Sequence, residues 1–128
     1  MDKNTLNFLS KLKNCSASKN FIFKFFATQK IKNIVIKLYS LGLIRSFKIS
    51  KTKYFYFNIT LYLKFECPLK NLKIISTPSK KKFLNFKNIT KLQISLSTTI
   101  IFSTNKGIFA HSDCLKNKVG GIVLFSIW

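Results

Sequence analysis

The stretch Ser103-Thr104-Asn105-Lys106-Gly107 places two hydroxyls, an amide, an ammonium group and a glycine in five consecutive residues. Hydroxyl and amide groups can hydrogen-bond to ribose 2′-OH groups and to base edges in the shallow minor groove of RNA. Lys106 can neutralise a phosphate, and Gly107 allows the backbone to approach a ligand closely. These residues therefore suit contact with RNA, although an ordinary polar hairpin loop has the same composition.

Groups for catalysis or metal binding are scarce. The chain has three acidic residues, one histidine and three cysteines, which do not readily supply an acid–base pair or an activated nucleophile. His111 and Cys114 form an isolated His-x-x-Cys spacing, which is weak support for a metal site. We therefore expect a protein that is not an enzyme, has no catalytic residue or metal site, and uses no cofactor or small-molecule substrate.

Positive charge dominates the chain. It has 23 Lys and Arg against 3 Asp and Glu, a formal net charge of +20 over 128 residues. A 47% hydrophobic content argues against a disordered basic tail. The charge suits a nucleic-acid backbone or an anionic membrane surface, with a solvated basic face as the plain alternative. A membrane span is not expected, because the longest uncharged stretch, Leu92–Asn105, is shorter than the roughly 20 apolar residues needed.

The N-terminal half contains the elements that would position its basic residues. Apolar spacing predicts a short helix at Asn4–Asn14, a strand at Phe21–Phe26 and a helix at Lys30–Leu41, with Thr28 as its N-cap and Gly42 as a left-handed C-cap.

The alternation in Tyr54–Phe65 predicts a long strand, with phenylalanine and aliphatic residues on one face and tyrosine and polar residues on the other. The turn-like Glu66–Asn71 is the predicted domain junction.

The C-terminal half is predicted to be mostly β, with the polar loop between strands. A basic triplet, Lys80–Lys82, follows the turn Ser76–Ser79. Ser112 is the predicted N-cap of a short helix that Gly120-Gly121 then breaks. The remaining predicted elements are strands at Leu72–Ile75, Thr98–Phe102 and Ile122–Trp128, a helical turn at Asn88–Leu92 and the short helix Asp113–Asn117.

The loop Ser103–Gly107, followed by Gly120-Gly121 and a final strand ending in Ile127-Trp128, closely resembles the bacterial-type small-subunit ribosomal protein eight family. That family has a Ser-Thr-Ser-Lys-Gly loop and a Gly-Gly-Glu turn at the same distance. The resemblance extends to Leu9–Asn14 and to Thr28–Ile44, so it covers nearly the whole chain. Asn105 replaces the loop's middle serine, Ile122 replaces the glutamate, and Thr77 and Ser79 replace arginine and glycine in an earlier turn.

The resemblance implies an α+β fold of two small α/β domains. Residues 1–66 would form the N-terminal helix-strand-helix-strands domain, and residues 67–128 a mostly β domain with a short helix. The family binds a hairpin in the central domain of small-subunit rRNA and touches neighbouring small-subunit ribosomal proteins, which implies these partners here. By position, the implied RNA-binding residues are Ser103, Thr104, Asn105, Lys106 and Gly107, with Gly120 and Gly121 shaping a pocket beside them, Thr28, Lys30 and Lys32 at the second helix, and Lys80, Lys81 and Lys82.

At the second helix, a capped helix with solvated lysines is the alternative interpretation. For the triplet Lys80–Lys82, the alternative is a solvated run of lysines.

Abundant Lys, Ile, Phe and Asn, without a recognisable presequence, favour a mitochondrial gene translated where it is used, with a plastid or an AT-rich bacterium as alternatives.

Two rival functions remain. A nucleoid-type or single-strand-binding protein would use Tyr54, Tyr56 and Tyr62 as stacking platforms. A membrane-surface protein would dock through Lys30–Leu41.

Overall fold

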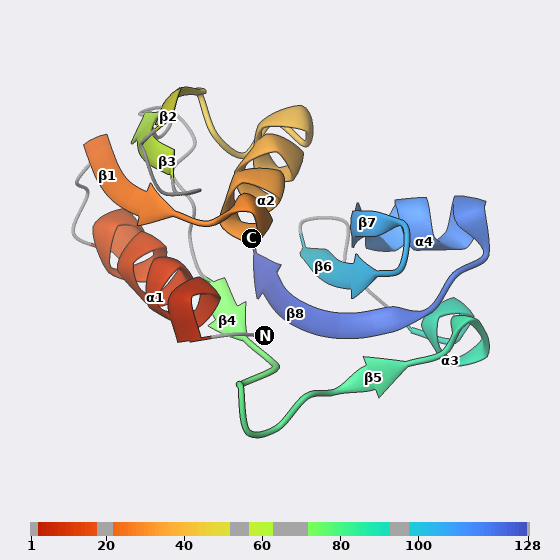
Figure 1. Cartoon of the computed structure of the whole chain (residues 1–128). Helices are drawn as coiled ribbons and strands as arrows, with labels where there is room; N and C mark the ends of the chain where they lie inside the picture. Colours follow the sequence, from red (N-terminus) through yellow and green to blue (C-terminus); the bar gives the residue numbers. More distant parts are fainter. Residues whose placement is uncertain (1–2, 18–21, 52–56, 63–71, 93–97, 128) are drawn as a thin grey trace. The chain divides into compact units, whose positions relative to one another are not determined.

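Helices and antiparallel strands make up both halves of the chain, which confirms the α+β class (Figure 1). The computed structural model describes residues 3–17, 22–51, 57–62, 72–92 and 98–127. The chain divides into two compact units, an N-terminal unit, Lys3–Asn71, and a C-terminal unit from Leu72 onward. The predicted junction Glu66–Asn71 falls outside the described residues, so the boundary at 66/67 stays a prediction.

The N-terminal unit is a three-stranded sheet with two helices. The strand order is β1-β3-β2, and both pairings are antiparallel. The elements in chain order are α1 (Lys3–Ala17), β1 (Ile22–Ala27), α2 (Gln29–Ser40), β2 (Ser46–Lys51) and β3 (Phe57–Tyr62).

Apolar burial explains why both helices pack on this sheet. Four residues of the predicted stripe of α2 are fully buried, as are Ile59 and Leu61 on the same face of β3, whereas the fifth, Leu41, is the C-cap and is 37% exposed. In α1, the ring of Phe8 packs edge-on against Phe25 of β1, with ring centroids 5.4 Å apart. The stripe residues of α2 therefore serve the core and are not available for docking on a membrane, although Ile36 and Tyr39 of the same helix are exposed. The buried stripe residues are Ile31, Ile34, Val35 and Leu38.

The ends of α2 show which local predictions were right. Thr28 occupies the predicted N-cap position in an extended conformation, but its side chain makes no capping hydrogen bond. At the other end Gly42 has φ 77°, and its N–H donates to the Tyr39 carbonyl at 3.0 Å. The N–H of Leu43 donates to the Leu38 carbonyl at 3.0 Å, which completes a Schellman motif. The predicted glycine C-cap is therefore confirmed.

The sheet contains one strand that the sequence analysis missed. β2 alternates serine or lysine with Phe47 and Ile49, and it is short and only half-buried, so its periodic signal is weak. β3 lies within the predicted strand Tyr54–Phe65. Phe21, residues 54–56 and residues 63–65, also part of predicted strands, lie outside the described residues.

The C-terminal unit is a five-stranded antiparallel sheet with two short helices. The path is β4-β8-β6-β7, and β5 also pairs with β8. Its core cluster includes Ile89, Phe102, Cys114 and Val123. The elements are β4 (Leu72–Ile74), β5 (Phe83–Leu84), α3 (Phe86–Thr90), β6 (Thr99–Thr104), β7 (Gly107–Ala110), α4 (His111–Asn117) and β8 (Gly121–Ile127).

Two helix starts in this unit differ from prediction. α3 begins two residues early because Asn85 is its N-cap, with its Oδ1 accepting from the Asn88 N–H at 2.9 Å. The predicted Ser112 cap of α4 is wrong: Ala110 holds the N-cap position, and its N–H donates to Asp113 Oδ2 at 3.3 Å. An acidic side chain in the first turn thus replaces the expected hydroxyl.

The end of α4 at Asn117 matches the prediction, but the residue that stops the helix does not. Lys118 is the C-cap and has a left-handed φ of 54°, so the glycine pair that follows is not what breaks the helix. None of the helices in the described part of the chain is both long and apolar enough to cross a membrane.

Candidate nucleic-acid interface

The polar loop is the tip of a tight β-hairpin between β6 and β7. Thr104 pairs with Gly107, which leaves Asn105 and Lys106 as an exposed two-residue turn. Gly107 has φ 127°, a conformation that residues with a Cβ rarely adopt, and there is open space where its Cβ would lie. Glycine is therefore required here by backbone conformation, not by crowding.

The hydroxyl of Thr104 organises this hairpin internally. Its Oγ1 donates to the Gly107 carbonyl at 2.8 Å and accepts from the Lys106 N–H at 3.2 Å. Within the described residues, by contrast, the Ser103 hydroxyl and the Asn105 amide make no such bond to the protein. Thr104 thus shapes the loop, while Ser103 and Asn105 keep hydrogen-bonding capacity for a ligand.

Gly120 and Gly121 are needed because neighbouring backbone lies almost against them. A Cβ on Gly120 would be 2.6 Å from the Leu84 carbonyl oxygen, and one on Gly121 would be 2.5 Å from the Ser103 carbonyl oxygen. Neither glycine has a positive φ. The glycine pair therefore lets the start of β8 fit between the end of β5 and the hairpin.

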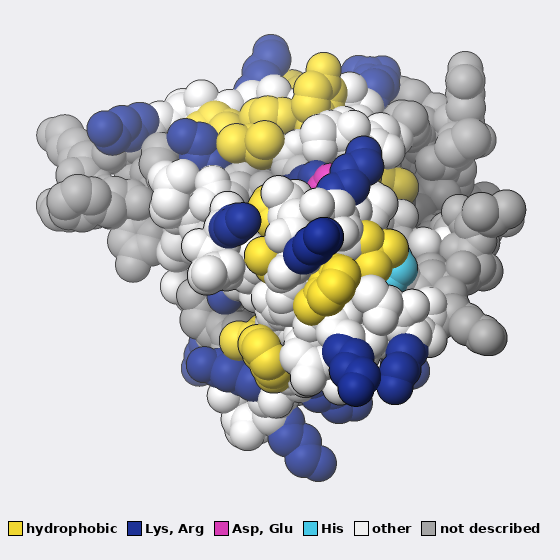
Figure 2. Space-filling model, turned by 90° about the vertical axis from the view of Figure 1, so that its right-hand side faces the viewer, with side chains coloured by type: hydrophobic (Ala, Val, Ile, Leu, Met, Phe, Trp, Pro, Cys, Tyr) yellow, Lys and Arg dark blue, Asp and Glu magenta, His cyan; other side chains and the backbone are white. Residues whose placement is uncertain are grey.

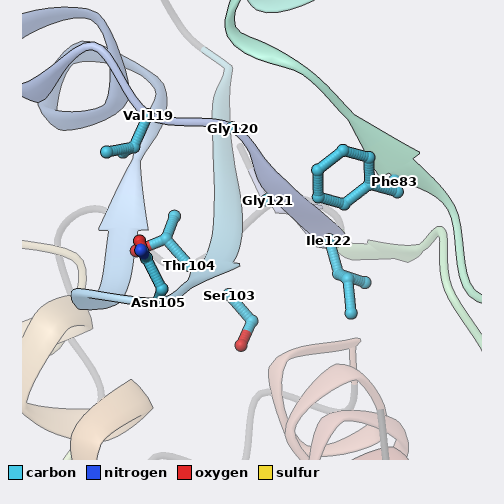
Figure 3. Close-up of a pocket in the computed structure, with 8 residues that line it drawn as sticks. All are labelled: Phe83, Ser103, Thr104, Asn105, Val119, Gly120, Gly121 and Ile122. Carbon is cyan, nitrogen blue, oxygen red and sulfur yellow. The ribbon is translucent and has the colours of Figure 1, made fainter.

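This close fit leaves an open pocket of about 650 Å³ beside the hairpin (Figure 3). In Figure 3, Ser103 lies between the hairpin tip and Ile122. Phe83, which is 66% exposed, lines the same pocket. One part of the lining is therefore apolar and another carries hydroxyl and amide groups. The lining residues are Phe83, Ser103, Thr104, Asn105, Val119, Gly120, Gly121 and Ile122.

The basic triplet Lys80–Lys82 is tied to the strand that borders the pocket. The buried Ser76 hydroxyl donates to the Val123 carbonyl and accepts from the Lys82 N–H at 3.1 Å. The N–H of Val123 in turn donates to the Lys82 carbonyl at 2.9 Å. The three lysines are exposed and immediately precede Phe83, and the backbone of Lys82 is held against β8 beside the pocket.

The third predicted group, at the start of α2, belongs to the N-terminal unit. Lys30 and Lys32 are half-buried, and the Lys32 N–H donates to the Thr28 carbonyl at 3.0 Å. The Thr28 hydroxyl is buried and has no hydrogen-bond partner. It could reach RNA only after a change of side-chain rotamer. These three residues therefore form a separate candidate surface.

The structure adds three residues to the pocket that sequence reasoning did not assign to RNA binding: Phe83, Val119 and Ile122. For Phe83 a signal existed, because an aromatic residue directly follows three lysines, but nothing in the sequence placed it opposite the hairpin. That position depends on the pairing of Phe83 with Ile122 in β5 and β8.

Acidic groups are nearly absent around these surfaces. Figure 2 shows a face on which Lys and Arg side chains are spread widely and the acidic colour is confined to one small patch. Asp113 is the acidic residue within the described segments, and its carboxylate accepts from the Ala110 N–H. The described residues contain no cluster of His, Cys, Asp or Glu that could hold a metal ion.

Comparison with known proteins decides the family. A family model described as ribosomal protein S8 matches residues 4–128. The chain belongs to the ribosomal protein S8 family. Among its S8 relatives, small ribosomal subunit protein uS8m of Acanthamoeba castellanii is 36% identical over 99 residues, covering 74% of this chain and 75% of the relative. Small ribosomal subunit protein uS8 of Phytoplasma mali is 32% identical over 133 aligned positions, covering 100% of this chain and 98% of the relative.

A third relative, uS8c of Bigelowiella natans, is 36% identical over 86 residues, covering 63% of this chain and 62% of the relative. S8 membership confirms the resemblance inferred from the hairpin and the glycine pair. It also confirms that the chain is a structural ribosomal protein of the small subunit and not an enzyme.

Proposed function

We propose that this S8 protein binds a hairpin in the central domain of small-subunit rRNA through the pocket beside the β6–β7 hairpin, and so helps to assemble the subunit. One observation carries the proposal: the loop and the glycine pair, which β7 and α4 separate in sequence, line the same pocket. Neighbouring small-subunit ribosomal proteins are the further partners we propose.

The pocket has the two kinds of surface that an unstacked RNA base requires. The Ser103 hydroxyl and Asn105 amide would hydrogen-bond to a base edge or to a 2′-OH group. Phe83 and Ile122 would lie against the apolar face of the base. Lys106, exposed at the turn, would contact a phosphate. Ile122 makes this part of the lining apolar where the family resemblance implies a carboxylate.

Lysines outside the pocket would contribute charge and not selectivity. The triplet Lys80–Lys82 lies next to Phe83 in sequence and would contact phosphates flanking the hairpin. Lys30 and Lys32, with the backbone at Thr28, would contact RNA backbone from the N-terminal unit. Phosphate contacts position a protein on RNA without reading its sequence.

Binding measurements with a hydroxyl substitution test the pocket. Ser103→Ala should weaken binding to the cognate hairpin by roughly tenfold, because losing one hydrogen bond costs about 1–1.5 kcal/mol, and should leave binding to random RNA almost unchanged. Ser112→Ala, at an exposed hydroxyl on α4, is the matched control and should change neither affinity. Equal losses for cognate and random RNA with Ser103→Ala would contradict the proposal.

We further propose that the protein works in a mitochondrial ribosome. The support is its likeness to a uS8m protein together with its Lys-, Ile-, Phe- and Asn-rich composition. The likeness to a uS8c protein makes a plastid the principal alternative. Hybridisation of the gene to purified mitochondrial and plastid DNA separates the two, and a signal from plastid DNA alone would refute the mitochondrial assignment.

A further inference from the structure

The sheet of the N-terminal unit has one face turned away from its helices. Phe25 and Phe47 point to the helical side, where they pack edge-on against Phe8 of α1 and Tyr39 of α2, each at 5.4 Å between ring centroids. Alternate residues of each strand point to the opposite side. We call this side the outer face. Its residues form rows across the three paired strands: Ile22, Tyr62 and Ser46 in one row, Lys24, Thr60 and Lys48 in the next, and Phe26 and Ser50 in the third.

Large apolar and aromatic side chains lie exposed on the outer face. Ile22 is 55% exposed and Phe26 is 52% exposed, while Tyr62 is partly exposed. A hollow of about 390 Å³ also lies along β1 and β3, and residues of both sides of the sheet line it: Lys24, Phe26 and Thr60 of the outer face, and Phe25 and Ile59 of the helical side. Aromatic residues on an exposed sheet face are typical of surfaces on which unpaired RNA bases stack.

Two cations lie near the Tyr62 ring. The Arg45 guanidinium carbon is 5.8 Å from the Tyr62 ring centroid, and the Lys48 Nζ is 6.0 Å from it. Lys24 and Lys48 are exposed on either side of Thr60. The described residues of this unit include no Asp or Glu. The outer face therefore combines aromatic rings with positively charged side chains.

We propose that the outer face binds a single-stranded segment of RNA, with a base stacked on Tyr62 and phosphates contacted by Lys24 and Lys48. Base stacking on an aromatic ring is stronger than a cation–π contact at an exposed site, so a base can displace the cations from the Tyr62 ring. A protein partner would instead need an acidic surface with an apolar centre. RNA supplies both the negative charge and the flat apolar faces.

Direct binding to a labelled oligouridylate, which cannot form the hairpin, tests this proposal with the full-length protein. Tyr62→Ile keeps a residue suited to a strand but removes the aromatic ring. It should weaken binding by about 5- to 150-fold, the range expected when one stacked base loses its platform. Tyr39→Ile, at a half-exposed tyrosine of α2 on the helical side, is the matched control and should leave the affinity unchanged.

Salt dependence tests the phosphate contacts separately. Lys48→Gln should reduce the slope of log affinity against log salt concentration by about 0.7, the value for one phosphate on a single strand. Lys51 lies on the same strand, but its position in the alternation belongs to the opposite face of the sheet. Lys51→Gln should therefore leave the slope unchanged. Circular dichroism would confirm that each variant is folded.

The outcomes distinguish this proposal from the one for the hairpin pocket. Ser103→Ala should leave the affinity for oligouridylate unchanged. Each of the two proposals can therefore be refuted without refuting the other. Wild-type protein that does not bind oligouridylate, or equal losses with Tyr62→Ile and Tyr39→Ile, would overturn the outer-face proposal. A photo-crosslinker at Lys24 should attach to RNA in assembled subunits; attachment to a ribosomal protein instead would also overturn it.

Discussion

Replacing Gly121 with alanine should distort the pocket through a backbone collision. The new Cβ would lie 2.5 Å from the Ser103 carbonyl oxygen, whereas ordinary contact begins at 3.4 Å. The strands β6 and β8 would therefore have to separate locally by about 0.9 Å, the difference between these two distances. Overpacking of this kind typically costs about 1–3 kcal/mol, which outweighs the gain in strand propensity from removing a glycine.

Urea denaturation of Gly121→Ala measures this cost. A loss of about 2 kcal/mol lowers the midpoint by roughly 1 M, and binding to the cognate hairpin should fall as well because Ser103 moves. The second contact of the new Cβ, at 2.9 Å, is with Thr104 Cγ2. Adding Thr104→Ser removes that methyl but not the carbonyl, so it should restore only part of the stability. Wild-type stability in Gly121→Ala, or full rescue by the second change, would refute the reasoning.

Three further changes test neighbouring parts of the site. Thr104→Val removes both hydroxyl bonds that hold the hairpin turn, so amide exchange at Lys106 should become faster while a protected core amide keeps its rate. Ser76→Ala should lower the free energy of unfolding by about 1–3 kcal/mol, because the Lys82 N–H loses its buried partner; an unchanged urea midpoint would contradict this. Replacing Lys80–Lys82 with glutamine should weaken cognate and random RNA equally and flatten the salt dependence; a loss confined to cognate RNA would give these lysines a sequence-reading role.

Strongly periodic or chemically distinctive segments could be predicted from the sequence. The apolar stripe of α2 and the glycine after it predicted a capped helix because burial and positive φ leave clear residue patterns. The loop Ser103–Gly107 likewise predicted a polar turn between strands. For Gly120 and Gly121 the position beside the loop was predicted, but the physical reason differs: they admit neighbouring backbone and do not break a helix.

Features that depend on long-range pairing could not be predicted in the same way. Phe83 enters the pocket because a two-residue strand pairs with β8, and two residues carry no periodic signal. The cap of α4 was missed because a carboxylate three residues into the helix takes the place of a capping hydroxyl. β2 was missed because its apolar residues are few and half-buried.

Sedimentation of the protein from an extract of its own cells through a high-salt gradient tests the central claim most directly. If it is a structural constituent of the small subunit, bound through a specific pocket and not by its net charge alone, it should remain with small-subunit rRNA at salt concentrations that remove loosely bound basic proteins. Ser103→Ala should be released at lower salt than Ser112→Ala. Release of the wild-type protein together with nonspecific basic proteins, or its migration with DNA, would contradict the account.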